Sequence, residues 1–403
     1  MTIQNPDDAV NRRIQYFTDR ERMLRANDFY YYNQPVEEIR GGARVIVRGR
    51  EMGMYASYSY LGLIGHPRIN AAAKAAVDKF GTGTNGVRTL AGTLTVHTEL
   101  EETISSFKHA EAAITYSSGY ATNLSVISTL MGRGDYILSD KLNHASIVDG
   151  CLMSGAEFRR FRHNDMADLE HRLQQVPQGV SRMVVVDAVF SMDGDIIDFP
   201  PLVELCKKYN AWLMVDEAHS LGILGKTGRG IEEYFDMPGV VDIQMGTLSK
   251  TIPSVGGYVA GRKDLIQYLR HASRAYIFSA AIPPAQAAAA SEAFKVILDE
   301  PWRIKKLQKN AEQFIQGLKG AGFDTMLTTT AIVPVLCKTD ERAFALTREC
   351  QHHDLFVLPV VSPAVPEGLA RLRATVLASH EPREIDYALG VIAEAGKKLG
   401  IIE

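Results

Sequence analysis

An acidic, an imidazole and an amine side chain occur at a spacing that suggests cofactor chemistry. Asp216 and His219 directly follow the apolar run Trp212–Val215, and Lys250 comes 34 positions after Asp216. In open α/β sheets, ligands bind just beyond the carboxyl ends of strands, where Asp216 would lie. A carboxylate there can keep a pyridine nitrogen protonated, and a lysine amine can form a Schiff base with an aldehyde. Pyridoxal 5'-phosphate (PLP) has both groups, so the pair predicts a PLP site.

Hydroxyl and glycine residues at two further points could hold the cofactor phosphate. Thr247 and Ser249 precede Lys250 and carry hydroxyl donors. Ser118–Tyr120 precede a helix predicted over Ala121–Leu130, whose first N–H groups can bind a dianion. Taken singly, these signals fit a surface lysine or an ordinary helix cap better. Their order along one chain favours a cofactor site.

A glycine-rich segment offers a competing interpretation. Gly81–Gly86 matches the G-x-G-x-x-G fingerprint of dinucleotide-binding proteins, in which the motif follows a strand and opens a helix. Here it follows a helix that we predict over Ile69–Phe80, with Pro67 near its start. We therefore reject a nicotinamide cofactor.

The composition narrows the class of protein. The chain has 403 residues, enough for one large core and a smaller second domain. A formal net charge of −3 provides no basic field for nucleic acid or an anionic membrane, so we expect a small-molecule enzyme. The four cysteines form no C-x-x-C pair, and we expect no metal site. Because no secretory signal and no apolar run of about 18 residues occurs, we expect a cytoplasmic protein.

Helical segments alternate with short apolar runs, as in doubly wound α/β proteins. Met183–Val186 and Trp212–Val215 predict buried parallel strands. We predict an N-terminal arm over 1–57, a large PLP-binding domain over 58–300 and a small C-terminal domain over 301–403. The later part predicts helices at Pro284–Leu298 and Glu384–Lys398, and strands at Ala331–Leu336, Leu355–Val360 and Leu372–Thr375.

An ordered series of short segments also matches one known family. The sequence resembles the α-oxoamine synthases, fold-type I PLP enzymes that include serine palmitoyltransferase and 8-amino-7-oxononanoate synthase. The resemblance runs from about Tyr58 to the C-terminus and looks closest to bacterial serine palmitoyltransferases. It implies an α/β, aspartate-aminotransferase-like fold with a mainly parallel sheet and a smaller C-terminal α+β domain. The matching segments include Tyr60–Leu63, Asn143–Ser146, Phe190–Gly194, Asp216–His219, Gly246–Lys250 and Gly256–Gly257.

The resemblance implies a role for each matching residue. Lys250 would hold PLP as a Schiff base and act as acid and base, and Asp216 would pair with the pyridine nitrogen. His144 would stack on the ring, while Ser191 and His219 would lie near its hydroxyl group. The implied catalytic residues are thus Lys250, His144, Asp216 and His219. The implied cofactor-binding residues are Ser118, Gly119, Tyr120, His144, Ser191, Asp216, His219, Thr247, Ser249, Lys250 and, from a second subunit, Ser279.

The resemblance also implies substrate contacts and an activity. Arg373 would bind the amino-acid carboxylate, a task that suits a bidentate guanidinium. Tyr58 and Val87 would lie near the substrates, but Val87 and Ser59 depart from the serine and asparagine of many members. We expect a decarboxylating condensation of a small α-amino acid, serine first and then glycine or alanine, with an acyl thioester. The acyl donor would be acyl-CoA or acyl carrier protein, and the enzyme a homodimer with shared active sites.

Two other functions stay open at this point. Fold-type I scaffolds support many reactions, so an aminotransferase is one alternative. A non-catalytic partner subunit is the other, although such a subunit would be expected to lack the cofactor lysine. The aromatic cluster Phe29–Tyr32 could line an acyl channel, but aromatic residues more commonly pack in cores and interfaces.

Overall fold

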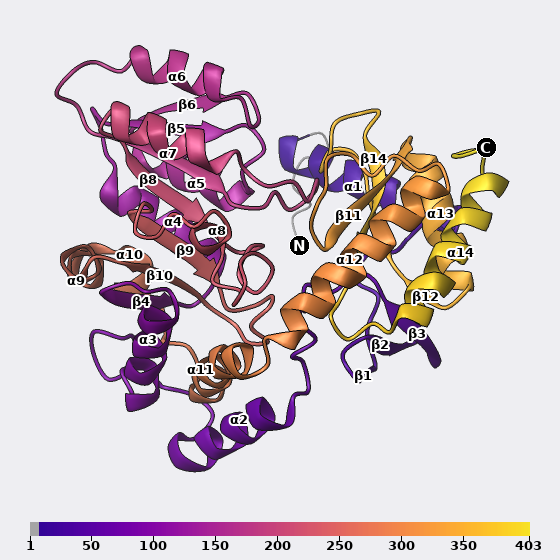
Figure 1. The fold of residues 1–403 in the computed structure, drawn as a ribbon, viewed down its shortest axis with the longest axis horizontal. Helices are drawn as coiled ribbons and strands as arrows, with labels where there is room; N and C mark the ends of the chain where they lie inside the picture. The colour runs from indigo at the N-terminus through magenta and orange to yellow at the C-terminus, as the bar shows by residue number, and fades with distance from the viewer. Residues whose placement is uncertain (1–7) are drawn as a thin grey trace.

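The computed structural model describes residues 8–403 and has two lobes (Figure 1). The larger lobe contains a seven-stranded sheet in the order β4-β10-β9-β8-β7-β5-β6. Strand β10 runs antiparallel to both of its neighbours, and the other six strands share one direction. The strands are β4 (Ala112–Tyr116), β5 (Tyr136–Asp140), β6 (Glu157–Phe161), β7 (Arg182–Asp187), β8 (Trp212–Asp216), β9 (Ile243–Thr247) and β10 (Gly257–Gly261).

Helices cover both faces of this sheet (Figure 1). On β7, Val184 and Val186 belong to the core cluster that includes α7 and α11, while Met183 and Val185 belong to the cluster that includes α4 and α5. Burial on both faces explains why these strands read as uninterrupted apolar runs. The helices of this lobe are α2 (Pro67–Phe80), α3 (Thr95–Phe107), α4 (Gly119–Leu130), α5 (Ala145–Ser154), α6 (Met166–Gln174), α7 (Phe199–Lys208), α8 (Ile231–Tyr234), α9 (Lys263–Ala272), α10 (Arg274–Ile277) and α11 (Pro284–Asp299).

The smaller lobe combines the end of the chain with its beginning. Helix α12 (Trp302–Gly320) runs from the junction of the lobes into it (Figure 1). An antiparallel sheet has the order β11-β14-β13, and a second sheet has the order β1-β2-β3-β12. The remaining elements are α1 (Ala9–Ala26), β1 (Glu38–Arg40), β2 (Arg44–Val47), β3 (Arg50–Met54), β11 (Ile332–Lys338), α13 (Asp340–His352), β12 (Leu355–Phe356), β13 (Leu358–Val360), β14 (Ala370–Thr375) and α14 (Pro382–Lys398).

The prediction of one strand over Leu355–Val360 was wrong in detail. The chain changes sheets at Val357: β12 pairs in parallel with β3, and β13 pairs antiparallel with β14. A continuous apolar run does not reveal such a change, because it carries no information about which strand lies beside it. The pairing with β3 also shows that the predicted N-terminal arm packs on the smaller lobe. Its residues 1–7 lie outside the described residues, and the predicted domain boundaries remain predictions.

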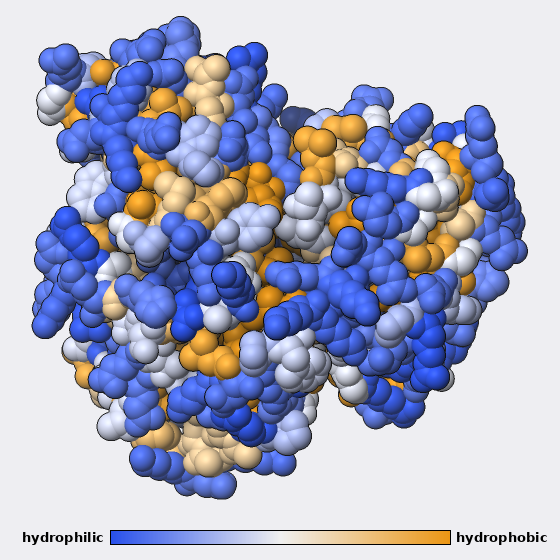
Figure 2. Space-filling view, in the orientation of Figure 1, coloured by the Kyte–Doolittle hydropathy of each residue, from blue (hydrophilic) through white to orange (hydrophobic). Residues whose placement is uncertain are grey.

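The aromatic segment near residue 30 serves packing in the smaller lobe. The ring of Phe29 stacks on Phe344 with centroids 5.4 Å apart, and Tyr31 is buried in the same core cluster. All four cysteines are free and buried. None of the helices within residues 8–403 is long and apolar enough to cross a bilayer. On the face shown in Figure 2, hydrophilic side chains dominate, and apolar ones gather where the two lobes meet.

Candidate active site

A cavity of about 250 Å³ lies at the carboxyl ends of the central strands. The last residues of β7, β8 and β9, which are Asp187, Asp216 and Thr247, all line it. Both Lys250 and Asp216 face this one cavity, so the two residues that predicted a PLP site do lie together. Ten of the eleven predicted cofactor-binding residues line the cavity, namely Ser118, Gly119, Tyr120, His144, Ser191, Asp216, His219, Thr247, Ser249 and Lys250.

A hydrogen-bonded chain of three side chains ends at Lys250, the predicted cofactor lysine. The Nζ atom of Lys250 lies 2.8 Å from His219 Nε2, and His219 Nδ1 lies 2.6 Å from the hydroxyl oxygen of Tyr60. Burial lowers the pKa of Lys250 to about 8, although the nearby Asp216 and Asp187 oppose this change. Burial and the neighbouring Lys250 also hold the pKa of His219 well below its usual range. The arrangement therefore gives Lys250 a far larger neutral fraction near pH 7 than an exposed lysine has.

The carboxylate of Asp216 is held from two sides. Asn123 donates to Asp216 Oδ2 over 2.7 Å, and the backbone N–H of Ala218 donates to Oδ1 over 2.9 Å. Asn123 also donates to Ser146 Oγ over 2.9 Å. Sequence reasoning missed Asn123. Helical spacing places it on the face of α4 that carries Gly119, four residues earlier, but gives no sign of its contact with Asp216.

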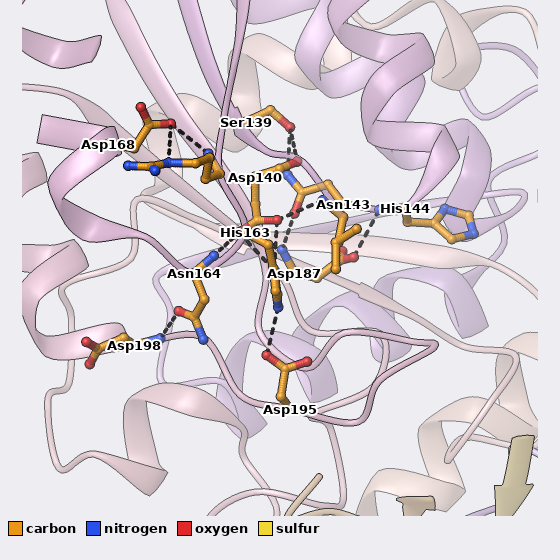
Figure 3. A network of polar contacts seen from close by, with 12 residues as sticks. Ser139, Asp140, Asn143, His144, His163, Asn164, Asp168, Asp187, Asp195 and Asp198 are labelled. Atoms are coloured by element: carbon orange, nitrogen blue, oxygen red, sulfur yellow. Dashed lines mark hydrogen bonds and ion pairs between the residues drawn. The ribbon is translucent and has the colours of Figure 1, made fainter. Parts of the chain in front are cut away.

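His144 lies at the start of α5, beside a second acidic side chain. The backbone N–H of His144 donates to Asp187 Oδ2 over 3.0 Å (Figure 3), and His144 Nδ1 accepts from the N–H of Ser146 over 3.2 Å. Burial lowers the pKa of His144. Burial, together with the nearby Asp216, raises the pKa of Asp187 well above its usual range. Asp187 was not among the predicted site residues, although its position at the end of an apolar run was a signal for it.

Another part of the cavity lining suits an anion. Ser118 caps α4 by accepting from the N–H of Ala121 over 3.1 Å, so the free N–H groups of the first helical turn lie beside the cavity. Thr247 Oγ1 and Ser249 Oγ lie 2.9 Å apart. A Cβ atom on Gly119 would approach Thr247 Oγ1 to 3.0 Å and would narrow this candidate anion site. The Tyr120 hydroxyl instead donates to Asp149, and its side chain is partly exposed.

These residues fit PLP. A buried lysine amine, a carboxylate held in place and an anion seat of hydroxyls and helical N–H groups share a cavity of suitable size. Together they match the aldehyde, the ring nitrogen and the phosphate of the cofactor.

The smaller lobe contributes one predicted substrate residue to the edge of the site. Arg373 on β14 donates from Nε to the carbonyl of Ser191 over 2.7 Å and from Nη1 to Thr375 Oγ1 over 3.0 Å. Its Nη2 is buried and has no hydrogen-bond partner within residues 8–403. The Tyr58 ring lies near both basic side chains, with its centroid 4.9 Å from Arg373 Cζ and 5.8 Å from Lys250 Nζ. Tyr58 and Lys250 also line a second cavity of about 590 Å³.

The structure does not bring two of the predicted residues to the cavity of their own chain. Val87 and Ser279 line neither cavity. The two segments that carry them lie side by side. Val87 forms an antiparallel bridge with Ala280, and the N–H of Ala281 donates to the carbonyl of Gly86 over 3.1 Å.

Comparisons with known proteins agree with this geometry. Residues 55–392 match the family model described as aminotransferase class I and II. The chain is 43% identical to an 8-amino-7-oxononanoate synthase of Thermoanaerobacter pseudethanolicus, over 92% of this chain and 94% of that protein. It is 40% identical to a serine palmitoyltransferase of Sphingobacterium spiritivorum, over 97% of this chain and 98% of that protein.

Solved structures show the same relationship. A serine palmitoyltransferase of S. paucimobilis with a bound PLP–myriocin aldimine has a TM-score of 0.95 and 35% identity, covering 98% of this chain and all of that one. The serine palmitoyltransferase of Sphingomonas wittichii also has a TM-score of 0.95, with 34% identity, 98% coverage of this chain and complete coverage of that one. The predicted fold-type I architecture and the PLP cofactor are thereby confirmed. The chain belongs to the α-oxoamine synthases, which are PLP-dependent acyltransferases.

Proposed function

We propose that this chain condenses a small α-amino acid with an acyl thioester, releasing CO₂ and a thiol and giving an α-amino ketone. The observation that carries the proposal is the position of Lys250, which lines both the cofactor cavity and the adjacent cavity of about 590 Å³. The Lys250 amine can therefore reach an amino acid in the cofactor cavity and an acyl donor in the adjacent cavity. The acyl donor is acyl-CoA or acyl carrier protein.

We assign the residues around the cofactor different roles in this reaction. When bound, PLP supplies an electron sink for a carbanion. Asp216 would stabilise the protonated ring nitrogen, His144 would stack on the ring, and Ser191 and His219 would lie beside its hydroxyl group. The hydroxyl and N–H groups of Ser118, Gly119, Tyr120, Thr247 and Ser249, which line the cavity, would hold the phosphate.

Proton transfer and substrate binding use two basic side chains, Lys250 and Arg373. Lys250, as a neutral amine, removes the proton from the amino-acid Cα and later returns one to the same carbon, a role that its lowered pKa supports. The free Nη2 of Arg373 binds the amino-acid carboxylate. The Cα carbanion then attacks the thioester carbon, the C–S bond breaks to release the thiol, and the carboxylate leaves as CO₂.

The second cavity is the proposed site of the acyl donor. Ile69, Ala73, Ala289 and Leu358 give part of its lining an apolar character that suits a hydrocarbon chain. Tyr58 lies at the boundary between this cavity and Arg373, where the amino acid and the acyl group would meet.

For the amino acid we propose serine first, with glycine and alanine as the alternatives. The structural similarity to two serine palmitoyltransferases, each aligned over its whole length, supports serine. The relatives named 8-amino-7-oxononanoate synthase, at 41–44% identity, are the reason to test the other amino acids with equal care.

We further propose a homodimer in which Ser279 and Val87 act in the site of the partner subunit. The paired segments that carry these two residues do not bring them into the cavities of their own chain. Two large apolar side chains in the same two segments, Leu90 and Phe278, are 84% and 71% exposed, and a partner subunit would cover them.

A spectral titration of the purified PLP-loaded enzyme tests the proposal. Serine, glycine and alanine are added separately while the visible absorbance is recorded, and a panel of acyl-CoA donors is then scored for thiol and CO₂. We expect a saturable change with serine, followed by equal amounts of thiol and CO₂. Formation of a keto acid together with pyridoxamine phosphate would instead identify an aminotransferase. Absence of a visible cofactor band would identify a non-catalytic subunit.

A further inference from the structure

A histidine outside the cavity bridges two buried carboxylates (Figure 3). His163 follows β6, and its Nδ1 lies 3.0 Å and 3.2 Å from the two carboxylate oxygens of Asp140, the last residue of β5. Its Nε2 lies 3.0 Å from Asp195 Oδ2. Both carboxylates are almost completely buried, while the His163 side chain is 26% exposed.

The geometry requires a charged imidazole. Ionised carboxylate oxygens only accept hydrogen bonds, so His163 satisfies both partners only when both ring nitrogens carry a proton. Burial opposes this charge, but the hydrogen bonds with Asp140 and Asp195 outweigh burial and raise the pKa of His163 to about 10. The His163 ring also meets the Phe190 ring nearly at a right angle, with centroids 4.4 Å apart.

The carboxylate of Asp140 organises the loop that carries the ring-stacking histidine. Besides His163, Asp140 accepts from the N–H groups of Leu142 and Asn164, each over 2.8 Å. The next residue of this loop, Asn143, donates to the carbonyl of Val185 over 2.7 Å. His144 follows directly, so one end of the histidine bridge anchors the start of the His144 loop.

Asp195, whose carboxylate contacts His163, ends a second loop, which meets the smaller lobe. The N–H of Phe190 donates to the carbonyl of Asp195 over 3.0 Å, which closes the turn between them. Within the turn, the carbonyl of Ser191 accepts from Arg373 Nε, and the Asp193 carboxylate pairs with Arg371. The loop 190–195 therefore supplies the backbone oxygen that orients the proposed carboxylate-binding arginine.

We infer that His163 is a positioning residue, whose imidazolium joins the His144 loop to the loop 190–195 and so orients Arg373 toward the amino acid. This role rests on the proposed function, since it presumes that Arg373 binds the substrate carboxylate. His163 touches neither cavity and takes no part in bond making.

The same atoms could be taken for a metal site, because ligand atoms of His163, Asp193 and Asp195 lie within 4.8 Å of one another. The charge balance argues against it. Asp193 is already neutralised by Arg371, and an imidazole that carries protons on both nitrogens has no lone pair for a metal.

The first test substitutes His163→Gln, which removes the charge and can donate to only one of the two carboxylates. In the PLP-loaded enzyme we expect the Kd and KM for the amino acid to rise about tenfold, within the range of about 2- to 30-fold typical of residues that act through others. We expect kcat and the KM for the acyl thioester to change less than about threefold. Arg162→Gln is the matched control, because it removes a neighbouring charge whose side chain is 71% exposed, and it should leave all four values unchanged.

The second variant, Asp195→Asn, keeps the contact of His163 with Asp140 and should reproduce the amino-acid effect even if His163→Gln folds poorly. Equal losses of kcat and of affinity for both substrates in this variant would overturn the inference, because they would indicate general damage to the fold.

Measurements on the cofactor-free protein separate this inference from the proposed function. Nitrogen NMR should show both ring nitrogens of His163 protonated at pH 7–8, and His163→Gln should speed amide hydrogen exchange in residues 190–195 without affecting β8. A neutral His163 at pH 7, or uniform exchange throughout the larger lobe, would overturn the inference. Stoichiometric Zn²⁺ binding that Asp195→Asn abolishes would also overturn it, since His163 would then be a metal ligand. If the wild-type enzyme released no thiol while both NMR and exchange results held, only the proposed function would fail.

Discussion

The two halves of the proposed active site, one for the cofactor and one for the substrate, are built in different ways. The cofactor half comes from the ends of neighbouring strands in one sheet and from the segments that follow them, so its contacts stay within the larger lobe even where they join distant positions, as between Asn123 and Asp216. The substrate half is assembled across the lobes. Arg373 is held by the carbonyl of Ser191, which lies 182 positions away.

This difference suggests that the cofactor half governs the chemical reaction, while the substrate half governs the choice of amino acid. The strand ends of a parallel sheet place the groups that hold the cofactor wherever that fold forms. The position of Arg373 depends in addition on how β14 of the smaller lobe meets the loop after β7. We therefore expect substitutions in the first half to reduce turnover and substitutions in the second half mainly to reduce substrate affinity.

The largest effect should come from Lys250→Ala, which removes the proposed acid and base. We expect turnover to fall about 10³-fold or more, because positioned proton transfer alone contributes about 10²–10⁴-fold. Thiol release from acyl-CoA measures the loss, and the absorbance of bound PLP shows whether the cofactor remains. Full activity in this variant would refute the assigned role.

Asp216→Asn should have the next largest effect. The amide carries no negative charge for the ring nitrogen, and hydrogen bonds to charged groups contribute about 1.5–3 kcal/mol, or roughly 10- to 150-fold. We expect weaker PLP binding in equilibrium dialysis and turnover reduced about 100-fold. Unchanged PLP affinity together with unchanged turnover would show that Asp216 does not face the ring nitrogen.

Arg373→Lys tests the substrate half. A lysine cannot reproduce the bidentate geometry of a guanidinium, so the amino-acid KM should rise about 10- to 100-fold while kcat falls less. Steady-state kinetics with serine varied and acyl-CoA fixed gives both values. The KM for acyl-CoA serves as the internal control, and a rise in that KM equal to the rise for serine would contradict the assignment.

Tyr60→Phe should have the smallest effect and should appear as a shift in pH dependence. Because the positive charge of Arg373 faces the Tyr60 oxygen, we expect the Tyr60 hydroxyl to donate to His219 Nδ1 and the Nε2 hydrogen of His219 to be directed at the neutral Lys250 amine. This arrangement favours neutral Lys250. Its loss should raise the pKa of Lys250 above about 8, by up to about one unit for a hydrogen bond of roughly 0.5–1.5 kcal/mol.

The shift can be measured as the pH dependence of the rate at which cofactor-free protein captures PLP. Tyr258→Phe is the matched control, since the buried hydroxyl of Tyr258 has no hydrogen-bond partner within residues 8–403. A shift of the same size in both variants, or a shift to lower pH in Tyr60→Phe, would contradict the proposed role of the hydrogen-bonded chain from Tyr60 through His219 to Lys250.

Much of the cofactor half could be predicted before the structure was known. Apolar runs that end in Asp187 and Asp216 locate strand ends, and the local pattern around Lys250 limits the chemistry. Asn123, His163 and the contact of Tyr60 with His219 could not be predicted in the same way. Each depends on a partner far away in the chain: Asn123 and Asp216 are 93 positions apart, and Tyr60 and His219 are 159 positions apart.

The sequence by itself determined that this protein has a sheet with buried strands and a lysine and an aspartate at strand ends, because side-chain periodicity and short motifs are local properties. The tertiary structure alone decided that Leu355–Val360 splits between two sheets, that Val87 and Ser279 lie away from the cavity of their own chain, and that His163 bridges two carboxylates. These features depend on which distant surfaces pack together, and neither residue spacing nor composition records that packing.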